Sequence, residues 1–308
     1  MSEYHVPVLL NESVEALNLK AGGIYVDATL GGGGHTAHIL LQQPDVKLFS
    51  FDQDPESLQQ TKALEDKFPD NLTIVHDNFA NLRTRLALER VRYIDGILFD
   101  LGVSSHQINQ PERGFSFSLN GRLDMRMDKA SNLTAYDIIN KFDDYKMKKI
   151  FWEYGEERSA AKIVRNIILE RDNKEIETTL QLAEIIDSCM PAKQRIKAKA
   201  RIFQALRIYI NGEIEVLKTA LADAVKMLNP GGRIVVISYH SLEDRVAKKF
   251  FQYEEKDCVC PSSFPQCVCD KKSTLKIITR KPLVPSSQEI EQNSRARSAK
   301  MRIAQKRS

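Results

Sequence analysis

The chain has 308 residues, of which 42% are hydrophobic and 28% charged, and its net charge is +4. These values are typical of a globular protein of one large or two modest domains and exclude a wholly disordered chain. No apolar run approaches the roughly 20 residues that cross a bilayer, and the N-terminal MSEYHVPVLLNE lacks the layout of a secretory signal, so we expect a cytoplasmic protein without a membrane partner.

Short apolar runs rich in β-branched and aromatic residues predict buried strands in the first hundred residues. These runs are residues 24–27, 47–52, 72–76 and 94–100. Helical periodicity separates them, as in the spacing of Leu58, Thr61 and Leu64. Strands that alternate with helices indicate right-handed βαβ crossovers and a parallel sheet covered on both faces, which is the α/β class.

The alternation of strands and helices stops near residue 106 and resumes near residue 213. The residues between lack a comparable strand but contain helical stretches, including 160–170 and 193–210. A helix at 213–228, a turn at 229–232, an apolar run at 233–238 and a helix from Ser241 follow. The sequence therefore predicts a discontinuous α/β domain of residues 1–106 and 213–308, interrupted by an all-helical domain of residues 107–212.

The helix expected at 193–210 has two contrasting faces. Its apolar stripe is formed by Ile196, Phe203, Leu206 and Ile210, and its basic face by Lys193, Lys197 and Arg201, which recur every fourth residue. The tail after Glu291 is also basic and contains no acid. Segregated positive charge suits a polyanion such as nucleic acid, and the alternative is a solvated helix face with a frayed tail.

The first predicted strand ends in a glycine-rich turn, DATLGGGGHT, at residues 27–36. Glycines allow a tight turn and a close approach of the backbone to a ligand before a helix begins. The second strand ends in Asp52, 18 residues after Gly34, a distance at which an acid reaches a ribose hydroxyl pair. Because ligands bind beyond the carboxyl ends of parallel strands, these features indicate a cofactor that contains adenosine.

Two other nucleotide-binding motifs fit the glycine turn less well. The dinucleotide motif G-x-G-x-x-G, counted from Gly31, requires glycine where Thr36 stands, and the phosphate-binding G-x-x-x-x-G-K-[ST] does not occur in the chain. An ordinary turn between a strand and a helix remains an alternative. However, the third and fourth strands are followed by Asn78-Phe79 and by DLGVSSHQ at residues 100–107. Packing alone does not explain polar or aromatic groups at four strand ends.

Nine segments of the chain together resemble one family. They are HVPVLLNES, DATLGGGGHT, FDQDP, DGILFDLGVSS, ERGFSF, GRLDMRM, EERSAAKIVRNI, LNPGGRIVVISYHSLEDR and RSAKMRIAQK, spread over residues 5–306. They resemble the bacterial MraW-type methyltransferases. The resemblance implies a Rossmann-like domain that binds S-adenosyl-L-methionine (SAM), with a helical insertion after the fourth strand. It also implies methylation of the exocyclic N4 of a cytidine in the decoding region of 16S ribosomal RNA, with this RNA or the small ribosomal subunit as partner.

The resemblance implies a set of cofactor contacts, carried over position by position. These contacts are Gly33, Gly34, His35, Asp52, Phe79, Asp100 and Gln107. Asp52 would bind the ribose hydroxyls and Phe79 would pack against the adenine. The residues from Gly33 to His35 would approach the methionine part, and Asp100 would lie nearest the reacting methyl.

The chemistry of an exocyclic amine suggests catalytic residues. The N4 lone pair is delocalised into the ring, so an acceptor on the N4 hydrogens would localise that pair and take the proton released during transfer. Asp100 is the first candidate for this acceptor. Tyr239 and His240 follow the fifth strand and could line the base pocket. Alternatively, His240 is a helix-start residue before a capping box of Ser241 and Asp244.

The ring that stacks on the base is open to several interpretations. Many amino-methyltransferases place two prolines and an aromatic residue after the fourth-strand acid, whereas this chain has Leu-Gly-Val-Ser after Asp100. Phe115, Phe117 or Tyr239 could supply the ring instead. The missing motif argues against a DNA amino-methyltransferase. A non-catalytic RNA-binding factor and an NAD-dependent enzyme are further alternatives, disfavoured by the strand-end residues and by Thr36.

A cytidine exposes N4 on its pairing edge, so the enzyme must act on an unpaired or extruded base. The phosphates around that base are expected to meet basic residues of the helical insertion. These are Arg158, Lys162, Arg165, Lys193, Lys197 and Arg201.

Four of the five cysteines lie close together in the sequence, at Cys258, Cys260, Cys267 and Cys269. Their spacing could hold zinc, although structural zinc sites more often have two to four residues between paired cysteines. The alternative is reduced thiols on a surface loop. The fifth, Cys189, lies in a helical stretch and is predicted to be a core residue.

Overall fold

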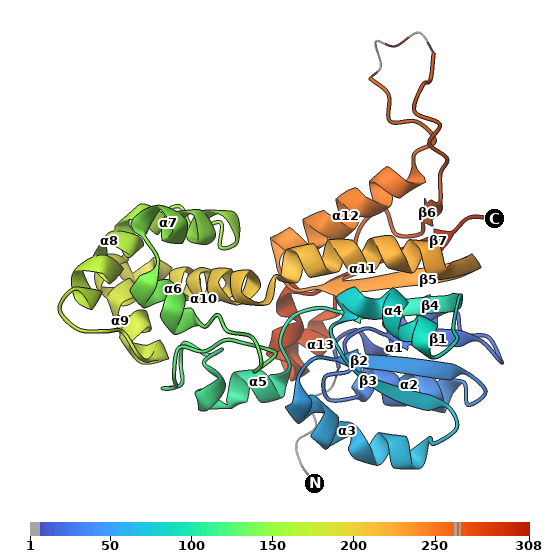
Figure 1. Cartoon of the computed structure of the whole chain (residues 1–308), viewed down its shortest axis with the longest axis horizontal. Helices are drawn as coiled ribbons and strands as arrows, with labels where there is room; N and C mark the ends of the chain where they lie inside the picture. The colour runs from blue at the N-terminus through green and yellow to red at the C-terminus, as the bar shows by residue number, and fades with distance from the viewer. Residues whose placement is uncertain (1–6, 262–263, 265) are drawn as a thin grey trace. The chain divides into compact units, whose positions relative to one another are not determined.

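The computed structural model describes residues 7–261, 264 and 266–308, so that His5 and Val6 of the segment HVPVLLNES lie outside the described residues. The chain divides into two compact units (Figure 1). One consists of Met1–Gly102 with Ile214–Ser308, and the other of Val103–Glu213. The first unit contains the sheet, so both ends of the chain build it, and the second contains the helical segment.

A mixed sheet forms the centre of the first unit, and the described residues give it seven strands. The strands are β1 (Ile24–Asp27), β2 (Lys47–Asp52), β3 (Leu72–His76), β4 (Ile94–Asp100), β5 (Leu228–Ser238), β6 (Leu275–Ile277) and β7 (Lys300–Lys306). Their spatial order is β3-β2-β1-β4-β5-β7-β6, with β1 to β5 parallel and β7 antiparallel to both its neighbours. The predicted α/β class is confirmed, and strands β6 and β7 were not predicted.

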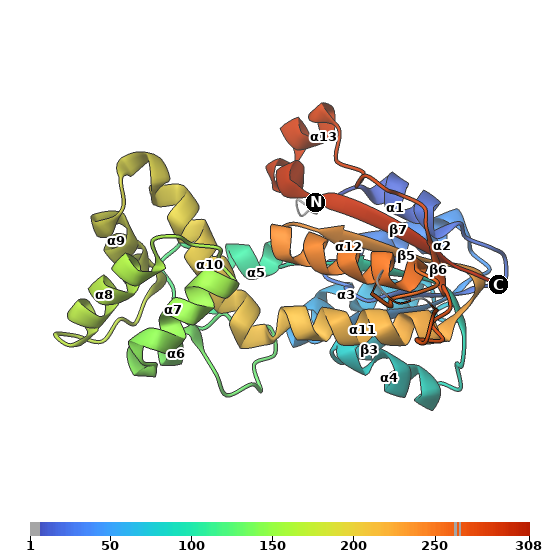
Figure 2. The same cartoon turned by 90° about the horizontal axis from the view of Figure 1, so that it is seen from above.

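Each face of the sheet is covered by its own hydrophobic core, because successive side chains of a strand point to opposite faces. Val26 and Phe99 belong to the core shared with helices α4 (Leu82–Leu88), α11 (Glu213–Met227) and α12 (Ser241–Glu255). Tyr25 and Leu98 belong to the core shared with α1 (Leu10–Leu17) and α2 (Gly34–Gln42). Figures 1 and 2 show α11 and α12 running along the sheet. The two-sided burial explains why these strands read as continuous apolar runs.

Helices of the first unit connect the strands and cover both faces. They are α1 (Leu10–Leu17), α2 (Gly34–Gln42), α3 (Pro55–Lys67), α4 (Leu82–Leu88), α11 (Glu213–Met227), α12 (Ser241–Glu255) and α13 (Ser287–Gln292), with 3-10 turns η1 (Phe79–Asn81) and η4 (Ser294–Ser298). Helix α3 begins where the Asp54 carboxylate accepts the Glu56 N–H and Pro55 occupies the first position. The chain thus turns sharply after β2, which leaves the end of that strand open.

Residues 229–232 were predicted as a turn, but the structure includes them in β5 as an irregular stretch. Pairing with β4 jumps from Leu228 opposite Ile94 to Arg233 opposite Gly96, and Gly231 has a φ of 82°. The positive φ suits glycine and lets the extra residues loop out without ending the strand.

The basic tail forms regular structure, which rules out the alternative of a frayed tail for residues 300–306. Residues Lys300–Lys306 form β7, and Arg302 is buried there. Its guanidinium donates to both carboxylate oxygens of Asp244 on α12, at 2.6 and 3.2 Å. This paired geometry satisfies a buried charge and fastens β7 to α12. Arg302 is therefore not available to a polyanion.

The second unit is built from helices around a separate core. They are α5 (Ser105–Asn109), α6 (Ala135–Lys141), α7 (Asp144–Glu153), α8 (Ala160–Arg171), α9 (Thr179–Cys189) and α10 (Arg195–Asn211), with 3-10 turns η2 (Pro111–Arg113) and η3 (Ala192–Gln194). Phe203, Leu206 and Ile210 of α10 enter this core as predicted. Ile196 does not, because 71% of its surface is exposed. The apolar face of α10 instead includes Ala198 and Ile202.

Among the described residues of this chain, the structure contains no helix long and apolar enough to cross a membrane.

Candidate functional site

The carboxyl ends of β1, β2 and β4 each bear an aspartate, and β1 lies between the other two strands. These residues are Asp27, Asp52 and Asp100. Because parallel strands end at the same edge of the sheet, the three carboxylates gather at one edge. The glycine turn begins directly after Asp27, so it lies at the same edge.

The glycine turn is held by hydrogen bonds to the strand ends. Asp27 is fully buried, and its carboxylate accepts from the Thr29 N–H at 3.1 Å and from the Thr36 hydroxyl at 2.8 Å. Thr36 also lies 2.7 Å from the Ser50 hydroxyl. These contacts fix both ends of the turn. Asp27 was not singled out from the sequence, although an acid at the end of the first strand was a signal that could have identified it.

Gly33 and Gly34 are required by packing within the chain itself. Gly33 is the N-cap of α2 with a φ of 75°, and a Cβ there would lie 2.4 Å from the Leu64 side chain. A Cβ on Gly34 would lie 2.2 Å from Pro7. At Gly32, by contrast, a Cβ would have no other atom within 4 Å. The turn is therefore open to solvent at Gly32. This position is next to Gly33 and Gly34, which the resemblance implies as cofactor contacts.

Asp52 joins the second strand to the glycine turn. Its Oδ2 accepts the Gly31 N–H at 2.9 Å and its Oδ1 accepts the Asp54 N–H at 2.8 Å. Burial raises the pKa of Asp52 to about 6, against the effect of these two donors. Each carboxylate oxygen has further acceptor capacity after one N–H. The Ser57 side chain also hydrogen-bonds this carboxylate, so about one of its four acceptor positions remains for a ligand hydroxyl.

Phe79 begins the 3-10 turn after β3 and is partly buried. Its ring packs edge-to-face on Phe99 of β4, with ring centroids 5.7 Å apart. Asn78 shapes the turn, because its side-chain oxygen accepts the Ala80 N–H and its amide donates to the Gln53 side chain at 2.7 Å. The aromatic ring is therefore held next to the Asp52 strand end by its neighbours.

Asp100 is surrounded by groups from several strand ends. Its backbone N–H donates to Thr29 Oγ1 at 2.7 Å, and its Oδ1 accepts the Tyr239 hydroxyl at 2.8 Å. Its Oδ2 lies 3.6 Å from Nδ1 of His35. Burial raises the pKa of Asp100 to about 6, while His35 and the Tyr239 hydrogen bond oppose that rise. The carboxylate is thus held in one orientation and is more basic than an exposed aspartate.

His35 is buried in the first turn of α2, and each of its ring nitrogens faces an oxygen. Nε2 lies 3.3 Å from the Val8 carbonyl, and Nδ1 faces Asp100. A carbonyl oxygen can only accept, so a hydrogen bond there places a proton on Nε2. His35 therefore connects the start of the chain to Asp100.

His240 is itself the N-cap of α12, which corrects the expected capping box of Ser241 and Asp244. Its Nδ1 accepts the Glu243 N–H at 3.4 Å, and the Glu243 carboxylate accepts the His240 N–H. Glu243 also accepts the Tyr239 N–H at 2.9 Å. The other ring nitrogen, Nε2, lies 3.0 Å from Glu243 Oε1. The geometry favours a capping role for His240 and a positioning role for Glu243 behind Tyr239.

The predicted residues of the helical unit are described within that unit. Gln107 is buried and forms a capping box with Ser104, whose N–H it accepts at 3.1 Å. Phe115 is 9% exposed and belongs to the helical core, and Phe117 packs edge-to-face on Phe203 with centroids 5.7 Å apart. Both phenylalanine rings therefore contribute to the stability of the unit.

The predicted basic residues are all exposed. Arg158, Lys162 and Arg165 lie on or just before α8, Lys193 lies in η3, and Lys197 and Arg201 lie on α10. Arg201 additionally lies 3.3 Å from the carboxylate of Glu157, which is buried. Arg201 therefore also neutralises a buried charge. In this role it differs from Lys193 and Lys197 of the same basic face.

The structure gathers the four clustered cysteines of the first unit, whose sulfur atoms all lie within 4.8 Å of one another. Cys189 is buried in the helical core, as predicted.

The sheet order, the acid at the end of β2 and the partly buried acid at the end of β4 define a Rossmann-like methyltransferase domain with a helical insertion. The model of the MraW methylase family matches residues 2–307. The chain belongs to this family, which confirms the resemblance seen in the sequence.

Curated relatives agree with this assignment over almost the whole chain. A protein of Carboxydothermus hydrogenoformans named Ribosomal RNA small subunit methyltransferase H is 52% identical over 307 residues, covering 98% of this chain and 97% of that protein. A relative of the same name from Halothermothrix orenii is 50% identical, covering 98% of each chain. A solved rRNA methylase from Streptococcus thermophilus has a TM-score of 0.44 and 13% identity, covering 99% of each chain.

Proposed function

We propose that this chain transfers a methyl group from SAM to the exocyclic N4 of a cytidine in the decoding region of small-subunit (16S) ribosomal RNA. The observation that carries the proposal is the partly buried carboxylate of Asp100, held by Tyr239 beside His35 and the glycine turn. The names of the curated relatives support ribosomal RNA of the small subunit as the substrate.

The strand ends fit the parts of SAM. Asp52 retains acceptor capacity for a ribose hydroxyl, and Phe79 offers an aromatic surface at the neighbouring strand end. The open side of the turn at Gly32 leaves room for the methionine part near Gly33, Gly34 and His35. Gln107 is proposed as a further contact, as the family resemblance implies. When bound, SAM supplies a methyl group that is already electrophilic.

Asp100 is proposed to accept a hydrogen bond from N4 and then its proton. Acceptance localises the N4 lone pair on nitrogen, which makes the amine a better nucleophile. A carboxylate with a pKa of about 6 is mostly ionised at neutral pH yet more basic than an ordinary aspartate. Tyr239 orients this carboxylate, and alignment of N4 with the methyl can contribute several kcal/mol to the rate.

Tyr239 is also the preferred ring for contact with the base. It lies in the same unit as Asp100, whereas Phe115 and Phe117 are packed within the helical unit. His240 is proposed to line the base pocket through the backbone that it caps, rather than to transfer protons.

The phosphates of the RNA are proposed to meet the exposed basic residues of the helical unit. These residues are Arg158, Lys162, Arg165, Lys193, Lys197 and Arg201. Their charge supports electrostatic attraction of a polyanion, and they carry no base specificity.

A thermal-shift comparison and a methylation assay test the proposal. SAM should raise the unfolding temperature of the purified chain, and NAD should not, because only SAM matches the strand ends. Labelled methyl should then enter small-subunit RNA in preference to DNA of equal length. Stabilisation by NAD alone, or transfer to DNA alone, would contradict it.

A further inference from the structure

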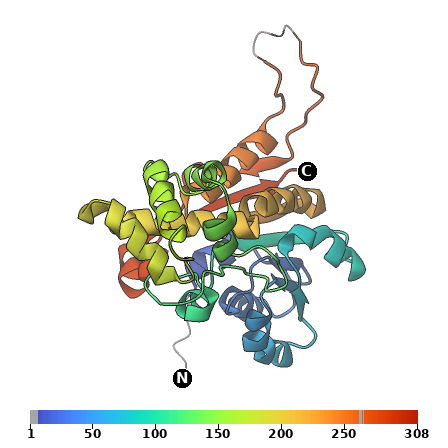
Figure 3. The ribbon, with the colours of Figure 1, turned by 60° about the vertical axis from the view of Figure 1, so that its left-hand side comes forward.

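The segment between α12 and β6 contains two Cys-x-Cys pairs separated by six residues. Figures 1 and 3 show this part of the chain leading away from the sheet. The described residues of segment 256–274 form neither helix nor strand. Val259, Phe264 and Val268 are 39%, 51% and 68% exposed, so the described residues of the segment form no apolar core of their own.

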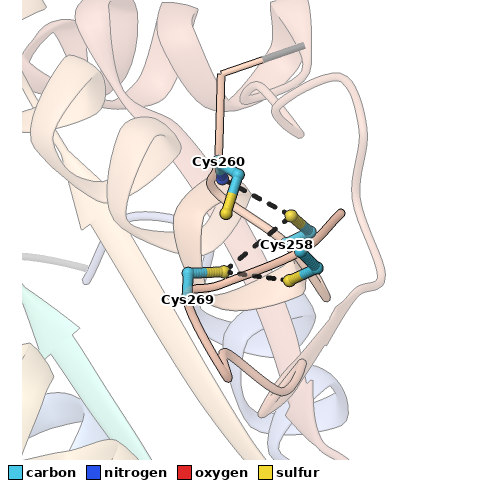
Figure 4. A group of neighbouring side chains, drawn as sticks. Cys258, Cys260 and Cys269 are labelled. Carbon is cyan, nitrogen blue, oxygen red and sulfur yellow. Dashed lines mark hydrogen bonds between the residues drawn. The ribbon is translucent and has the colours of Figure 1, made fainter. Parts of the chain in front are cut away.

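The four sulfur atoms of this segment lie close enough together to share one metal ion. Cys267 and Cys269 have sulfurs 3.5 Å apart, Cys269 and Cys258 have sulfurs 3.8 Å apart, and the whole set lies within 4.8 Å. Four sulfurs around Zn²⁺ at about 2.3 Å would be separated by about 3.8 Å along each edge. Figure 4 shows the sulfurs of Cys258, Cys260 and Cys269 converging.

Backbone N–H groups of the same segment point at these sulfurs. The N–H of Val259 donates to Cys269, that of Cys260 to Cys258, and that of Val268 to Cys260, each at 3.4 Å. A thiol is a weak acceptor, whereas a thiolate is a charged acceptor that gains from such donors. The fold of the loop therefore suits negatively charged sulfur and supplies the surrounding hydrogen bonds that orient metal ligands.

A disulfide network explains these distances poorly. A disulfide requires sulfurs about 2.05 Å apart, whereas the four cysteines are free in the structure. Four reduced thiols at the surface would instead be readily oxidised, and as thiolates they would repel one another. A divalent cation removes both problems, because it neutralises the charge and shields the sulfurs.

We propose that Cys258, Cys260, Cys267 and Cys269 bind one Zn²⁺ as four thiolates and that this metal joins residues 256–261 to residues 266–274. Four protein ligands close the coordination sphere, so the site is structural. The C-terminal end of the segment is held against α12 without the metal. Thr274 N–H donates to the Glu254 carbonyl at 2.9 Å, and the Lys271 ammonium lies 4.5 Å from the Tyr253 ring centroid. Loss of zinc should therefore loosen residues 258–269 and leave the sheet folded.

The metal content of the untagged full-length chain, purified without a chelator, tests this site. Elemental analysis should give one zinc per chain, and a mercurial reagent that modifies thiolates should release it. The double variant C258S/C267S should contain no zinc. The matched control C189A changes the buried cysteine outside the cluster and should retain a full equivalent.

Limited proteolysis supplies a readout of the loop itself. C258S/C267S should be cleaved within 256–274 at least tenfold faster than wild type, while its thermal unfolding temperature and SAM binding stay near the wild-type values. Iron in place of zinc, disulfides between these cysteines in freshly purified protein, or zinc retained by C258S/C267S would each overturn the proposal. None of these results depends on methyl transfer, so failure here is distinct from failure of the proposed function.

Discussion

The Tyr239 hydroxyl donates a 2.8 Å hydrogen bond to Oδ1 of Asp100, across 139 residues of sequence. The contact exists because β4 and β5 are parallel neighbours, with Asp100 opposite Ile237 in their register. Both side chains therefore emerge at the carboxyl edge of the sheet. This edge also carries the glycine turn and Asp52, so the orientation of one carboxylate is tied to the cofactor residues.

Replacing Tyr239 by phenylalanine should shift the acidic limb of the pH–rate profile to higher pH. The hydroxyl lowers the pKa of Asp100, so its loss raises that pKa further above about 6. Hydrogen bonds to charged groups contribute about 1.5–3 kcal/mol, so kcat/KM should fall tenfold or more at pH 6 and recover largely at pH 8.5. The exposed Tyr93, changed to phenylalanine, is the control. An equal loss at every pH would contradict this role.

Replacing Asp100 by asparagine should abolish methylation and stabilise the protein at alkaline pH. The folded pKa of Asp100 is raised to about 6 from 3.8, so the folded state binds the extra proton and loses stability as pH rises from about 4 to 6. Asparagine does not titrate, so D100N should exceed wild type by about 1–3 kcal/mol at pH 8 and by little at pH 4. Chemical denaturation at both pH values measures this difference, with D70N as the exposed control. A less stable D100N at pH 8 would count against the burial argument.

Replacing Asp52 by asparagine should weaken SAM binding more than turnover. An amide retains one acceptor oxygen, whereas the carboxylate already accepts two N–H groups and must also accept the ribose. We expect the Kd for SAM to rise about 10- to 100-fold, equivalent to about 1.4–2.8 kcal/mol, with kcat near wild type at saturating SAM. Calorimetric titration measures the Kd. An unchanged Kd would remove Asp52 from the cofactor site.

His240 can be tested by exchanging one capping residue for another. Asparagine caps helices well, so H240N should keep both stability and activity, whereas H240A should lose about 1 kcal/mol of stability. The free energy of unfolding and kcat of the two variants decide the matter. A stable but inactive H240N would show that the imidazole takes part in the chemistry.

Reversing the charge at Lys193 and Lys197 should weaken RNA binding and its salt dependence. Arg201 is left in place, because a glutamate there would face the buried carboxylate of Glu157. Loss of two phosphate contacts should reduce the slope of log affinity against log salt by about 1.5. The variant K146E/K149E makes the same charge change on α7. RNA binding should weaken in the first variant only, and SAM binding should be unchanged in both.

Strands β1 to β4 could be predicted with their observed bounds, and the second half of β5 from residue 233, because strands buried on both faces are continuous apolar runs between glycines and acids. Strand β7 was not predicted, because its sequence KMRIAQK is interrupted by basic residues and is not a continuous apolar run. The burial of Arg302 in this strand depends on its partner Asp244, which is distant in the sequence. Ile196 was misplaced because helical periodicity predicts one continuous stripe, whereas the first turn of α10 extends beyond the core. The formation of β7 and the exposure of Ile196 both depend on contacts between segments that are distant in the sequence.

For the candidate site, residues at strand ends could be proposed from sequence, whereas their partners could not. The Thr36–Asp27 bond and the approach of His35 to Asp100 depend on the path of the glycine turn. The cap of α12 was predicted one residue late, because serine is the commoner cap and histidine is rarely considered for that position. Hydrogen bonds of this kind can be identified only from the three-dimensional structure.

The most direct measurement is mass mapping of small-subunit RNA from a strain that lacks this chain, complemented with wild type or with D100N. If this chain methylates the cytidine, one methyl group should be missing from a single decoding-region cytidine in the deletion strain. Wild type should restore it on N4, and D100N should not. A methylation pattern identical in the deletion strain and its parent, or full restoration by D100N, would contradict the account.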